Sequence, residues 1–408
     1  MNFKEAYELL EKYGQLHILK YYEELDDEQK EDLIKQIASV DFNVLDLIKE
    51  KSILTEKGKI EPLAAMQLEE IEKKKTSFTE TGMKAIQQGK TGAVLLAGGM
   101  GTRLGSDDPK GMYNIGITKD VFIFERLIEN LLDVVRQTGT WIQLFIMTSD
   151  KNHSATVEFF KKMNYFGYKE EYITFFMQEM ALACDYNGKV YMEEKGQICM
   201  SPNGNGGWFS SLIRSGALKK INEAGIEWLN IFSVDNVLQR ICDPCFIGAT
   251  IEQKCEVGSK VVKKANPDEK VGVMCLEDRK PSIVEYYELT EEMMNAKDTS
   301  GEPAFNFGVI LNYLFNLNKL QEIAKKQLPL HIVEKKINYI DEKGTLVKPE
   351  TPNGYKFETL VLDMIHLADS CLPYEVVRDY EFAPIKNKTG VDSVESARAL
   401  CEKNNISL

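Results

Sequence analysis

AVLLAGGMGTRLGSDDPKGMYNIG, residues 93–116, is the most informative stretch of this sequence. It begins as an apolar strand and changes at once to a loop with glycines at 98, 99, 101 and 105. Glycines directly after a strand let the backbone approach a ligand, and their N–H groups can form a concave anion site. Arg103 and Lys110 lie in the same loop, and a guanidinium with an ammonium commonly binds phosphate oxygens. The stretch therefore predicts a strand followed by a phosphate-binding loop.

Two commoner glycine-loop patterns do not fit this stretch. The dinucleotide fingerprint G-x-G-x-x-G, placed at Gly99, needs glycine or alanine at 104, where the chain has Leu104. That spacing argues against a dinucleotide-dependent oxidoreductase. The P-loop pattern fails because Lys110 is followed by Gly111 and the glycine spacing differs. A plain strand-to-helix turn remains an alternative, although few such turns combine so many glycines with two cations.

Composition limits the class of protein and of partner. The chain has 408 residues, which predicts a large core with at least one accessory part. Its formal net charge of −13 argues against nucleic acid or an anionic membrane as a partner. No apolar run approaches the roughly 20 residues of a membrane span, and the N-terminus MNFKEAYELL lacks the features of a signal peptide. We therefore expect a cytoplasmic protein.

The eight cysteines are then expected to be reduced thiols, most of them buried. Cys242 and Cys245 form a C-x-x-C, but no second pair completes a zinc set. The four histidines lie outside every motif, which argues against a histidine-dependent hydrolase.

The first 85 residues are expected to form a helical N-terminal region without chemistry of its own. Apolar residues recur with helical spacing from 2 to 24, Asp26 with Gln29 resembles a capping box, and Asp41 could begin a third helix. From Thr91 onward strands alternate with helices, at 122–137, 142–149, 155–163 and 172–178. This alternation predicts an α/β sheet whose ligands bind at the carboxyl ends of the strands. The stretch 356–373 has apolar spacing that predicts another helix.

Three later positions attract attention in the expected α/β core. The strand at 172–178 ends on Gln178, an amide that could contact a base edge. SPNGNGGWF, residues 201–209, is either a flexible turn or a loop that presents its amides before a helix. The stretch 226–238 contains a buried strand that ends in Asp235. A carboxylate at that position predicts a magnesium ligand. The alternative is that Asp235 caps the segment that follows.

These motifs resemble those of the eukaryotic-type UDP-N-acetylhexosamine (UDP-N-acetylglucosamine) pyrophosphorylases, in the UDPGP type 1 family. The glycine-rich loop carries the resemblance, which extends from about Gly14 to Leu400. It implies a Rossmann-like, GT-A-like nucleotidyltransferase core with a mixed sheet flanked by helices. It also implies that UTP and N-acetylglucosamine 1-phosphate react to give UDP-N-acetylglucosamine and pyrophosphate, with Mg²⁺ as cofactor. We expect the core at 86–380 and a short C-terminal segment at 381–408.

The resemblance also implies roles for individual residues. Arg103 and Lys110 would hold the β- and γ-phosphates, and Lys386, in EFAPIKNKTG, would bridge the α-phosphate and the sugar phosphate. The residues implied to bind the nucleotide are Leu96, Ala97, Gly98, Gly99, Gln178 and Gly204. Those implied to hold the hexosamine are Asn205, Gly272, Glu285 and Asn306.

The sequence departs from the family pattern at two places. The residue after Gly308 is commonly Asn in these enzymes and is Val309 here, which keeps a UDP-glucose or UDP-galactose type of pyrophosphorylase open as an alternative. A noncatalytic nucleotide-sugar sensor is a further alternative, against which the four charged residues Arg103, Lys110, Asp235 and Lys386 argue. The chain stops at Leu408, where family members usually continue into a β-rich domain, so we expect a monomer or weak oligomer.

Overall fold

The computed structural model describes residues 1–49 and 58–408. The chain forms two compact units, each assembled from three separate stretches of sequence. Unit 1 comprises Met1–Glu56, Glu179–Gly207 and Leu328–Val361, and unit 2 comprises Lys57–Gln178, Trp208–Gln327 and Leu362–Leu408. The division into 1–85, 86–380 and 381–408 uses contiguous ranges and stays a prediction.

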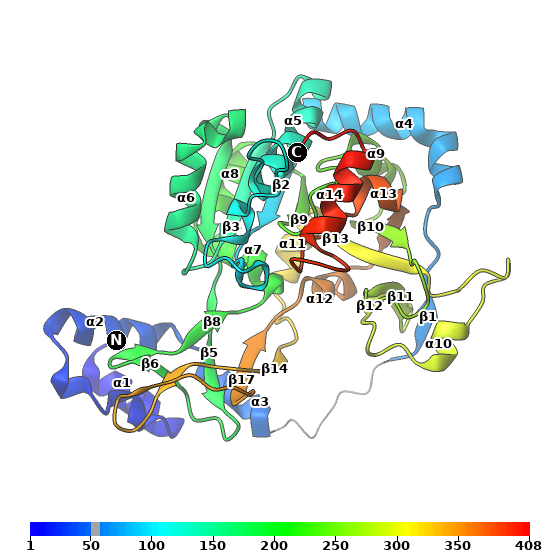
Figure 1. Ribbon diagram of the computed structural model, residues 1–408. Coiled ribbons are helices and arrows are strands. Elements are labelled where there is room, and N and C mark those ends of the chain that lie inside the picture. Colours follow the sequence, from blue (N-terminus) through cyan, green and yellow to red (C-terminus); the bar gives the residue numbers. More distant parts are fainter. Residues whose placement is uncertain (50–57) are drawn as a thin grey trace. The chain divides into compact units, whose positions relative to one another are not determined.

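A large mixed β-sheet forms the centre of unit 2 (Figure 1). Its main path runs β1-β11-β13-β9-β2-β3-β4, and β10, β12 and β18 branch from it. The strands β9, β2, β3 and β4 are parallel, whereas β13 pairs antiparallel with β9. The strands of this sheet within residues 58–408 are β1 (Ile60–Pro62), β2 (Thr91–Leu96), β3 (Gln143–Thr148), β4 (Ile173–Met177), β9 (Trp228–Ser233), β10 (Val257–Lys263), β11 (Val273–Glu277), β12 (Lys280–Val284), β13 (Phe307–Asn316) and β18 (Cys371–Glu375).

Helices cover this sheet, which confirms the predicted α/β class with a mixed sheet flanked by helices. All residues of the central strand β2 are buried, as expected for a parallel strand covered on both faces. The longer helices of unit 2 are α4 (Leu68–Gln87), α5 (Ile123–Thr138), α6 (His153–Lys162), α9 (Pro244–Glu252) and α14 (Val394–Lys403). The shorter ones are α7 (Trp208–Arg214), α8 (Ala217–Glu223), α10 (Glu291–Asn295), α11 (Leu317–Ile323) and α13 (Arg378–Glu381). A further helix, α12 (Val361–His366), begins at the last residue of unit 1.

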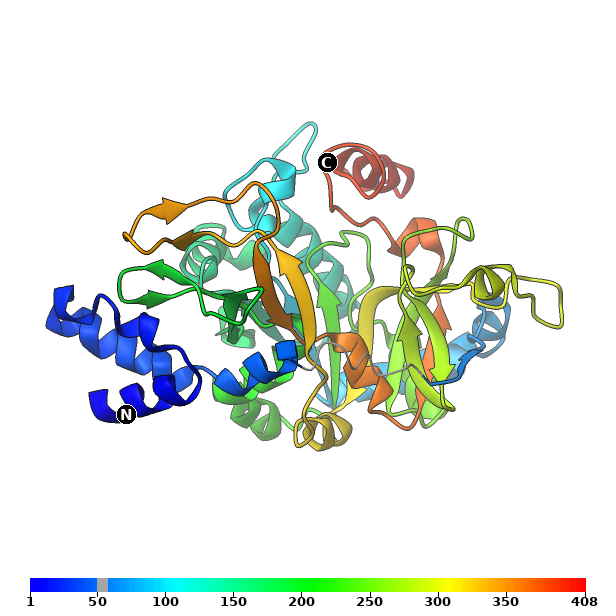
Figure 2. The ribbon, with the colours of Figure 1, turned by 90° about the horizontal axis from the view of Figure 1, so that it is seen from below.

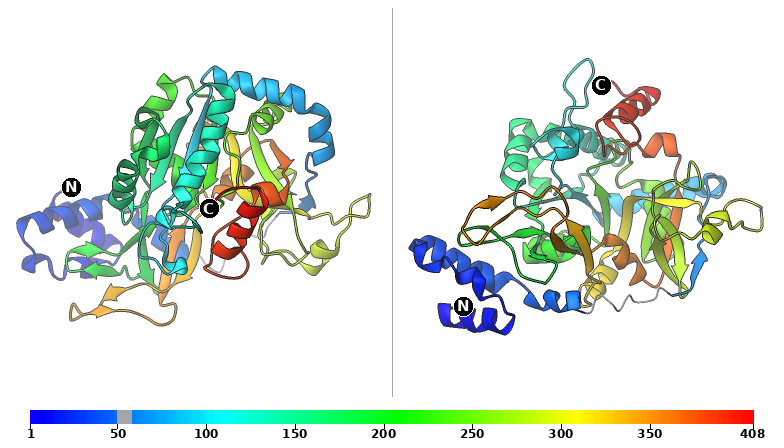
Figure 3. Two further views of the ribbon diagram at one scale, coloured as in Figure 1. Left: turned by 45° about the horizontal axis from the view of Figure 1, so that its top comes forward. Right: turned by 60° about the horizontal axis from the view of Figure 1, so that its bottom comes forward.

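The helices α4 and α9 pack with their backbones almost in contact (Figure 3). A Cβ on Gly82 would lie 1.8 Å from the carbonyl oxygen of Pro244, and one on Gly248 would lie 1.7 Å from that of Phe78. Side chains larger than hydrogen at these two positions would push the helices apart.

Unit 1 contains a four-stranded antiparallel sheet in the order β14-β17-β5-β8. Its strands are β5 (Met180–Asp185), β8 (Met200–Pro202), β14 (His331–Lys335) and β17 (Gly354–Glu358). Two short pairs extend from it in the same direction (Figure 2): β6 (Met192–Glu194) with β7 (Gln197–Ile198), and β15 (Tyr339–Ile340) with β16 (Leu346–Val347).

The helices of unit 1 are α1 (Phe3–Lys12), α2 (Asp27–Ser39) and α3 (Asp46–Lys49), as far as its described residues extend. The predicted capping box is confirmed, because Asp26 accepts from the backbone N–H of Gln29 and the Gln29 side chain accepts from the N–H of Asp26. Asp41 begins a helical turn, as expected, by accepting from the N–H of Asn43. The helix expected from 2 to 24 is shorter, ending at Lys12.

The prediction of one helix over 356–373 is wrong. The stretch contains the end of β17, the short helix α12 and the start of β18. Its apolar spacing has a different cause: Phe357 is buried on β17 in the sheet of unit 1, whereas Val361 and Met364 are buried on α12. Apolar residues of a strand and of a short helix together gave the spacing expected for one helical face.

No helix among the described residues is both long and apolar enough to cross a lipid bilayer. All eight cysteines have free thiols, and every one except Cys255 is buried.

Candidate active site

The carboxyl ends of four parallel strands in unit 2 meet at one edge of the sheet. Leu96 at the end of β2 lies opposite Ser233 of β9 and Met147 of β3, and β4 ends beside β3. The antiparallel strand β13 begins near this edge. Ligands of open α/β sheets bind outside the carboxyl ends of the strands. Several predicted site residues of unit 2 lie at this edge: Leu96 ends β2, Gln178 and Asp235 follow β4 and β9, and Asn306 precedes β13.

The loop after β2 closes on itself through backbone hydrogen bonds. The N–H of Gly101 donates to the carbonyl of Asp108 at 2.8 Å, and the N–H of Lys110 donates to that of Gly99 at 3.1 Å. Between them, Thr102–Leu104 forms a 3-10 turn that ends at Gly105 with φ of 77°. The loop therefore holds Lys110 at its base and Arg103 on the turn. Arg103 is exposed and makes no hydrogen bond or ion pair within residues 1–49 and 58–408.

Asn152 fixes the first residues of this loop, a role that the sequence did not reveal. Its Nδ2 donates to the carbonyl of Ala97 at 2.9 Å and to that of Gly99 at 3.4 Å, and its Oδ1 accepts from the N–H of Ser149 at 2.7 Å. Asn152 is fully buried. An asparagine directly before a helix usually indicates a cap, but this side chain makes no capping hydrogen bond to α6.

Gly98 and Gln178, both predicted to bind the nucleotide, lie against each other. A Cβ on Gly98 would be 2.9 Å from Oε1 of Gln178. Gln178 is buried, and its N–H donates to the carbonyl of Thr148 at 2.7 Å, which continues the pairing of β3 with β4. Leu96 and Ala97, which precede Gly98, are also buried.

Lys110 forms an ion pair with Asp235, the predicted metal ligand. Lys110 Nζ lies 2.6 Å from Asp235 Oδ1, and the two side chains are 11% and 33% exposed. The carbonyl of Asp235 accepts from the N–H of Ile385 at 2.9 Å, which places Lys386 beside it along the backbone. Lys386 Nζ itself contacts Oδ2 of Asp392 at 3.0 Å. Two of the predicted phosphate-binding lysines and the predicted metal ligand are thus brought together.

The donor set around Asp235 is compatible with magnesium shared with a phosphate ligand. Within the described part of the chain, the carboxylate of Asp235 contacts only Lys110, and no group of three or more His, Cys, Asp or Glu residues could hold a metal. Mg²⁺ is commonly held by one or two carboxylates together with substrate phosphates and water. A single carboxylate beside cationic side chains is compatible with a Mg²⁺ ion that binds together with a nucleotide.

Gly272 and Glu285, predicted to hold the sugar, face each other at the open end of the β11–β12 pair. A Cβ on Gly272 would lie 3.5 Å from Oε1 of Glu285. Val309, the departure from the family pattern, donates its N–H to the carbonyl of Gly272 at 2.9 Å. Asn306 precedes β13, and its carbonyl accepts from the N–H of Lys264 at 2.9 Å. Val309 therefore lies beside Gly272, one of the residues predicted to hold the sugar.

Gly204 and Asn205 belong to unit 1, where they pack against the chain after β17. Gly204 has φ of +87°, and a Cβ there would lie 2.2 Å from the carbonyl oxygen of Thr359. Oδ1 of Asn205 accepts from the N–H of Val361 at 2.9 Å. The Asn205 side chain, expected to contact a sugar, thus has a structural hydrogen bond as well. The same loop leads to a 3-10 turn at Asn205–Gly207 and then to α7 and α8, two helices where the sequence indicated one.

The chain belongs to the UTP–glucose-1-phosphate uridylyltransferase family, UDPGP, whose model matches residues 42–408. It is similar to the UDP-N-acetylglucosamine diphosphorylase 2 of Arabidopsis thaliana, with 35% identity over 96% of this chain and 82% of that protein. It is also 33% identical to the UDP-N-acetylhexosamine pyrophosphorylase-like protein 1 of Mus musculus, over 94% of this chain and 80% of that protein. Among solved structures, the UDP-N-acetylglucosamine pyrophosphorylase of Trypanosoma brucei in complex with inhibitor superimposes with a TM-score of 0.82, at 29% identity over 97% of this chain and 84% of that one. The resemblance seen in the sequence is confirmed.

Proposed function

We propose that this chain is a uridylyltransferase that makes UDP-N-acetylglucosamine and pyrophosphate from UTP and N-acetylglucosamine 1-phosphate. The observation that carries the proposal is the meeting of Lys110, Asp235 and Lys386 at the carboxyl edge of a nucleotidyltransferase-type sheet. The relatives named for this activity resemble the chain over most of its length.

The reaction requires cationic groups that neutralise the phosphates, and it does not require a general base. Both substrates are anionic, and the attacking oxygen of the sugar phosphate is already ionised. Catalysis of such transfer is mostly positioning and electrostatic stabilisation of the phosphates. With a formal net charge of −13, the protein must attract its substrates through a local group of cations.

The cationic residues at the edge would bind the phosphate groups of the two substrates. Arg103 and Lys110 would hold the β- and γ-phosphates and stabilise the departing pyrophosphate, and Lys386 would bridge the α-phosphate and the sugar phosphate. Mg²⁺, held by Asp235 and phosphate oxygens, would neutralise part of the phosphate charge. Arg103 has no competing partner in the described structure and is therefore available to a phosphate at no cost in ion pairs.

Further residues would recognise the nucleotide and the sugar. The backbone of Leu96–Gly99, together with Gln178 and Gly204, would select uracil. Asn205, Gly272, Glu285 and Asn306 would hold the hexosamine. A cytoplasmic location and a monomeric or weakly oligomeric state remain part of the same proposal.

One specific observation favours a second candidate, a UDP-glucose or UDP-galactose type of pyrophosphorylase. Val309 places an apolar side chain on β13 beside Gly272, where the family commonly has an amide. The loss of that amide removes a polar group that could contact an N-acetyl substituent.

The test is pyrophosphate release from UTP and Mg²⁺, measured separately with N-acetylglucosamine 1-phosphate, glucose 1-phosphate and galactose 1-phosphate. We expect a strong preference for the N-acetylated sugar. A preference for glucose or galactose 1-phosphate would favour the second candidate, and no release with any of them would contradict both.

A further inference from the structure

Lys260 is a fully buried lysine outside every motif of the sequence. It lies in the middle of β10, between β13 and β18, and its side chain has no solvent exposure. A buried ammonium is costly unless its donors are satisfied. Lys260 Nζ donates to Glu381 Oε2 at 2.5 Å, to the carbonyl of Arg240 at 3.0 Å and to Asp243 Oδ2 at 3.3 Å. Its three N–H donors therefore have three acceptors.

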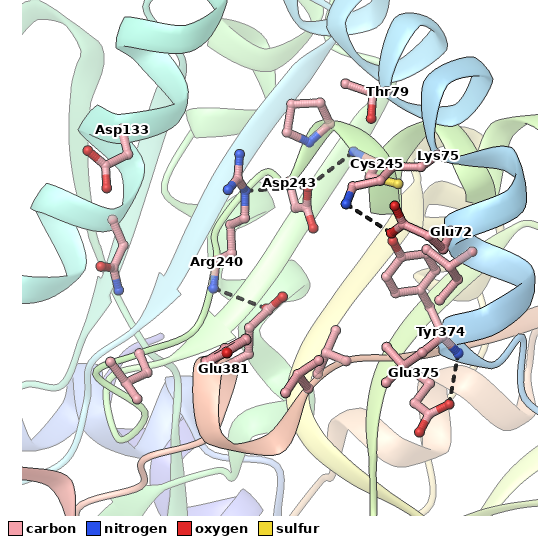
Figure 4. Close-up of a pocket in the computed structure, with 18 of the residues that line it drawn as sticks. Glu72, Lys75, Thr79, Asp133, Arg240, Asp243, Cys245, Tyr374, Glu375 and Glu381 are labelled. Carbon is pink, nitrogen blue, oxygen red and sulfur yellow. Dashed lines mark hydrogen bonds and ion pairs between the residues drawn. The ribbon is translucent and has the colours of Figure 1, made fainter. Parts of the chain in front are cut away.

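The three acceptors belong to the two segments that carry Asp235 and Lys386. Arg240 and Asp243 lie on the segment that follows Asp235, and Glu381 ends α13, directly before the segment with Lys386. Glu381 also accepts from the N–H of Arg240 at 3.2 Å. The side chains of Arg240, Asp243 and Glu381 lie together along one wall of a pocket of about 1040 Å³ (Figure 4). None of the predicted site residues lines that pocket.

Asn236 extends this connection to the candidate site. Its Nδ2 donates to the carbonyl of Glu381 at 2.6 Å, and its Oδ1 accepts from the N–H of Ala383 at 2.9 Å. Two residues further on, the N–H of Ile385 donates to the carbonyl of Asp235. A continuous set of hydrogen bonds thus runs from Lys260 to the backbone beside Lys386.

The charges explain why a lysine at 260 matters. The side chains of Asp243 and Glu381 are only 11% and 15% exposed, so without Lys260 two mostly buried carboxylates would share one site. Burial raises the pKa of the Glu381 carboxyl, and Lys260 opposes that shift. The Lys260 ammonium keeps both segments together by attraction to both carboxylates.

We propose that Lys260 is a positioning residue for the transfer reaction, because it holds the segment with Lys386 against the segment with Asp235. The inference rests on the proposed function and adds a residue that contacts no substrate. Misplacing a catalytic group by about 1 Å can cost roughly 100-fold in rate. We therefore expect Lys260→Met to lower kcat by about tenfold or more, with little change in the KM for UTP.

Lys319→Met is the matched control. Lys319 is also mostly buried and ion-paired with three carboxylates, those of Glu256, Glu322 and Asp369. It lies on α11, which follows the carboxyl end of β13, away from the edge where the predicted site lies. Lys319→Met should lower the unfolding temperature and leave kcat within about twofold, since no segment of the site depends on it.

A second variant separates positioning from stability. Lys260→Met/Glu381→Gln removes the unpaired buried carboxylate, so its unfolding temperature should return toward that of the wild type. Its kcat should stay low because the hydrogen bonds from Lys260 to Asp243 and to the carbonyl of Arg240 are still missing. Recovery of kcat together with stability would overturn the proposal, and so would a kcat within twofold of the wild type in folded Lys260→Met.

Two further measurements complete the test. In a Lys386→Ala background, Lys260→Met should cause less than about a twofold further loss of kcat, whereas an undiminished loss would show that Lys260 does not act through Lys386. Amide hydrogen exchange at Ile385 should be faster in Lys260→Met than in the wild type or Lys319→Met, and unchanged exchange would contradict the proposal. The exchange measurement needs no substrate. Failure of the proposed function would appear separately, as a wild type that releases no pyrophosphate.

Discussion

Two glycine-rich loops carry half of the predicted site residues, and they are built in opposite ways. The loop at 97–111 in unit 2 ends with a lysine in an ion pair, carries an exposed arginine and has open space beside Gly99. The loop at 203–207 in unit 1 has no charged side chain, and two of its glycines, Gly204 and Gly206, lie against the backbone of 359–360. The first loop can act through charge, whereas the second can act only through its packing and its neutral polar groups. Substitutions in the loop at 97–111 should therefore change the kinetics, whereas substitutions in the loop at 203–207 should change the stability.

The largest effect is expected from Lys110→Ala in the charged loop. Loss of one preorganised charged donor costs on the order of 3 kcal/mol of barrier, which corresponds to a fall in kcat of about 100-fold. Steady-state kinetics with UTP and the preferred sugar phosphate measure it. Lys90→Ala is the control, because Lys90 also pairs with a carboxylate, that of Glu227, but lies before β2 rather than after it. A loss for Lys110→Ala no greater than threefold would remove Lys110 from the mechanism.

Gly204→Ala should act on stability, because the loop of unit 1 is packed. The new Cβ would lie 2.2 Å from the Thr359 carbonyl oxygen at a positive φ. Gly14, in the same unit, has φ of +68°, and no described residue beyond its chain neighbours has an atom within 4 Å of an added Cβ. Gly14→Ala therefore measures the backbone cost alone, about 1–2 kcal/mol. Gly204→Ala should lower the unfolding temperature clearly more than Gly14→Ala does. Equal shifts in thermal unfolding would mean that the close packing at Gly204 is not important.

Gly99→Ala should affect ligand binding without affecting stability. Within residues 1–49 and 58–408, no atom beyond the adjacent residues lies within 4 Å of the added Cβ, so the unfolding temperature should not change. If the nucleotide approaches this backbone, the methyl group will occupy its space, and the KM for UTP should rise roughly tenfold, equivalent to about 1.4 kcal/mol. An unchanged KM would place the nucleotide elsewhere.

Val309→Asn should have the smallest effect, confined to sugar selectivity. A restored amide beside Gly272 could contribute one hydrogen bond, about 1 kcal/mol. The ratio of kcat/KM for N-acetylglucosamine 1-phosphate over glucose 1-phosphate should then rise about fivefold. A ratio that stays constant would show that position 309 does not contact the N-acetyl group.

Local signals in the sequence predicted much of unit 2 and part of unit 1. The change from an apolar strand to glycines located β2 and its loop, and Asp26 with Gln29 located the start of α2. The sheet edge followed from the alternation of strands and helices. The individual roles of the site residues still depend on the resemblance to the family and on the experiments above.

Long-range pairing was beyond the reach of sequence patterns. No local pattern distinguishes Lys260 from the other lysines, because its carboxylate acceptors Asp243 and Glu381 are far away in the chain. Asn152 lies outside every motif of the sequence, and its side chain holds the loop after β2. The sheet of unit 1 joins strands from distant stretches of the chain. Local sequence patterns therefore could not predict which strands form it, or that β17 ends within 356–373.

The pairing of β5 with β17 has a consequence for synthesis on the ribosome. Gly354 lies opposite Asp185, so β5 leaves the ribosome long before its partner exists. At about 5–20 residues per second, the wait is on the order of ten seconds or more. During that time, the edge of β5 that β17 later covers is open to pairing with other chains. The nascent protein therefore needs protection until residue 358 has emerged, and its yield in cells should depend on chaperones more than the stability of the finished fold suggests.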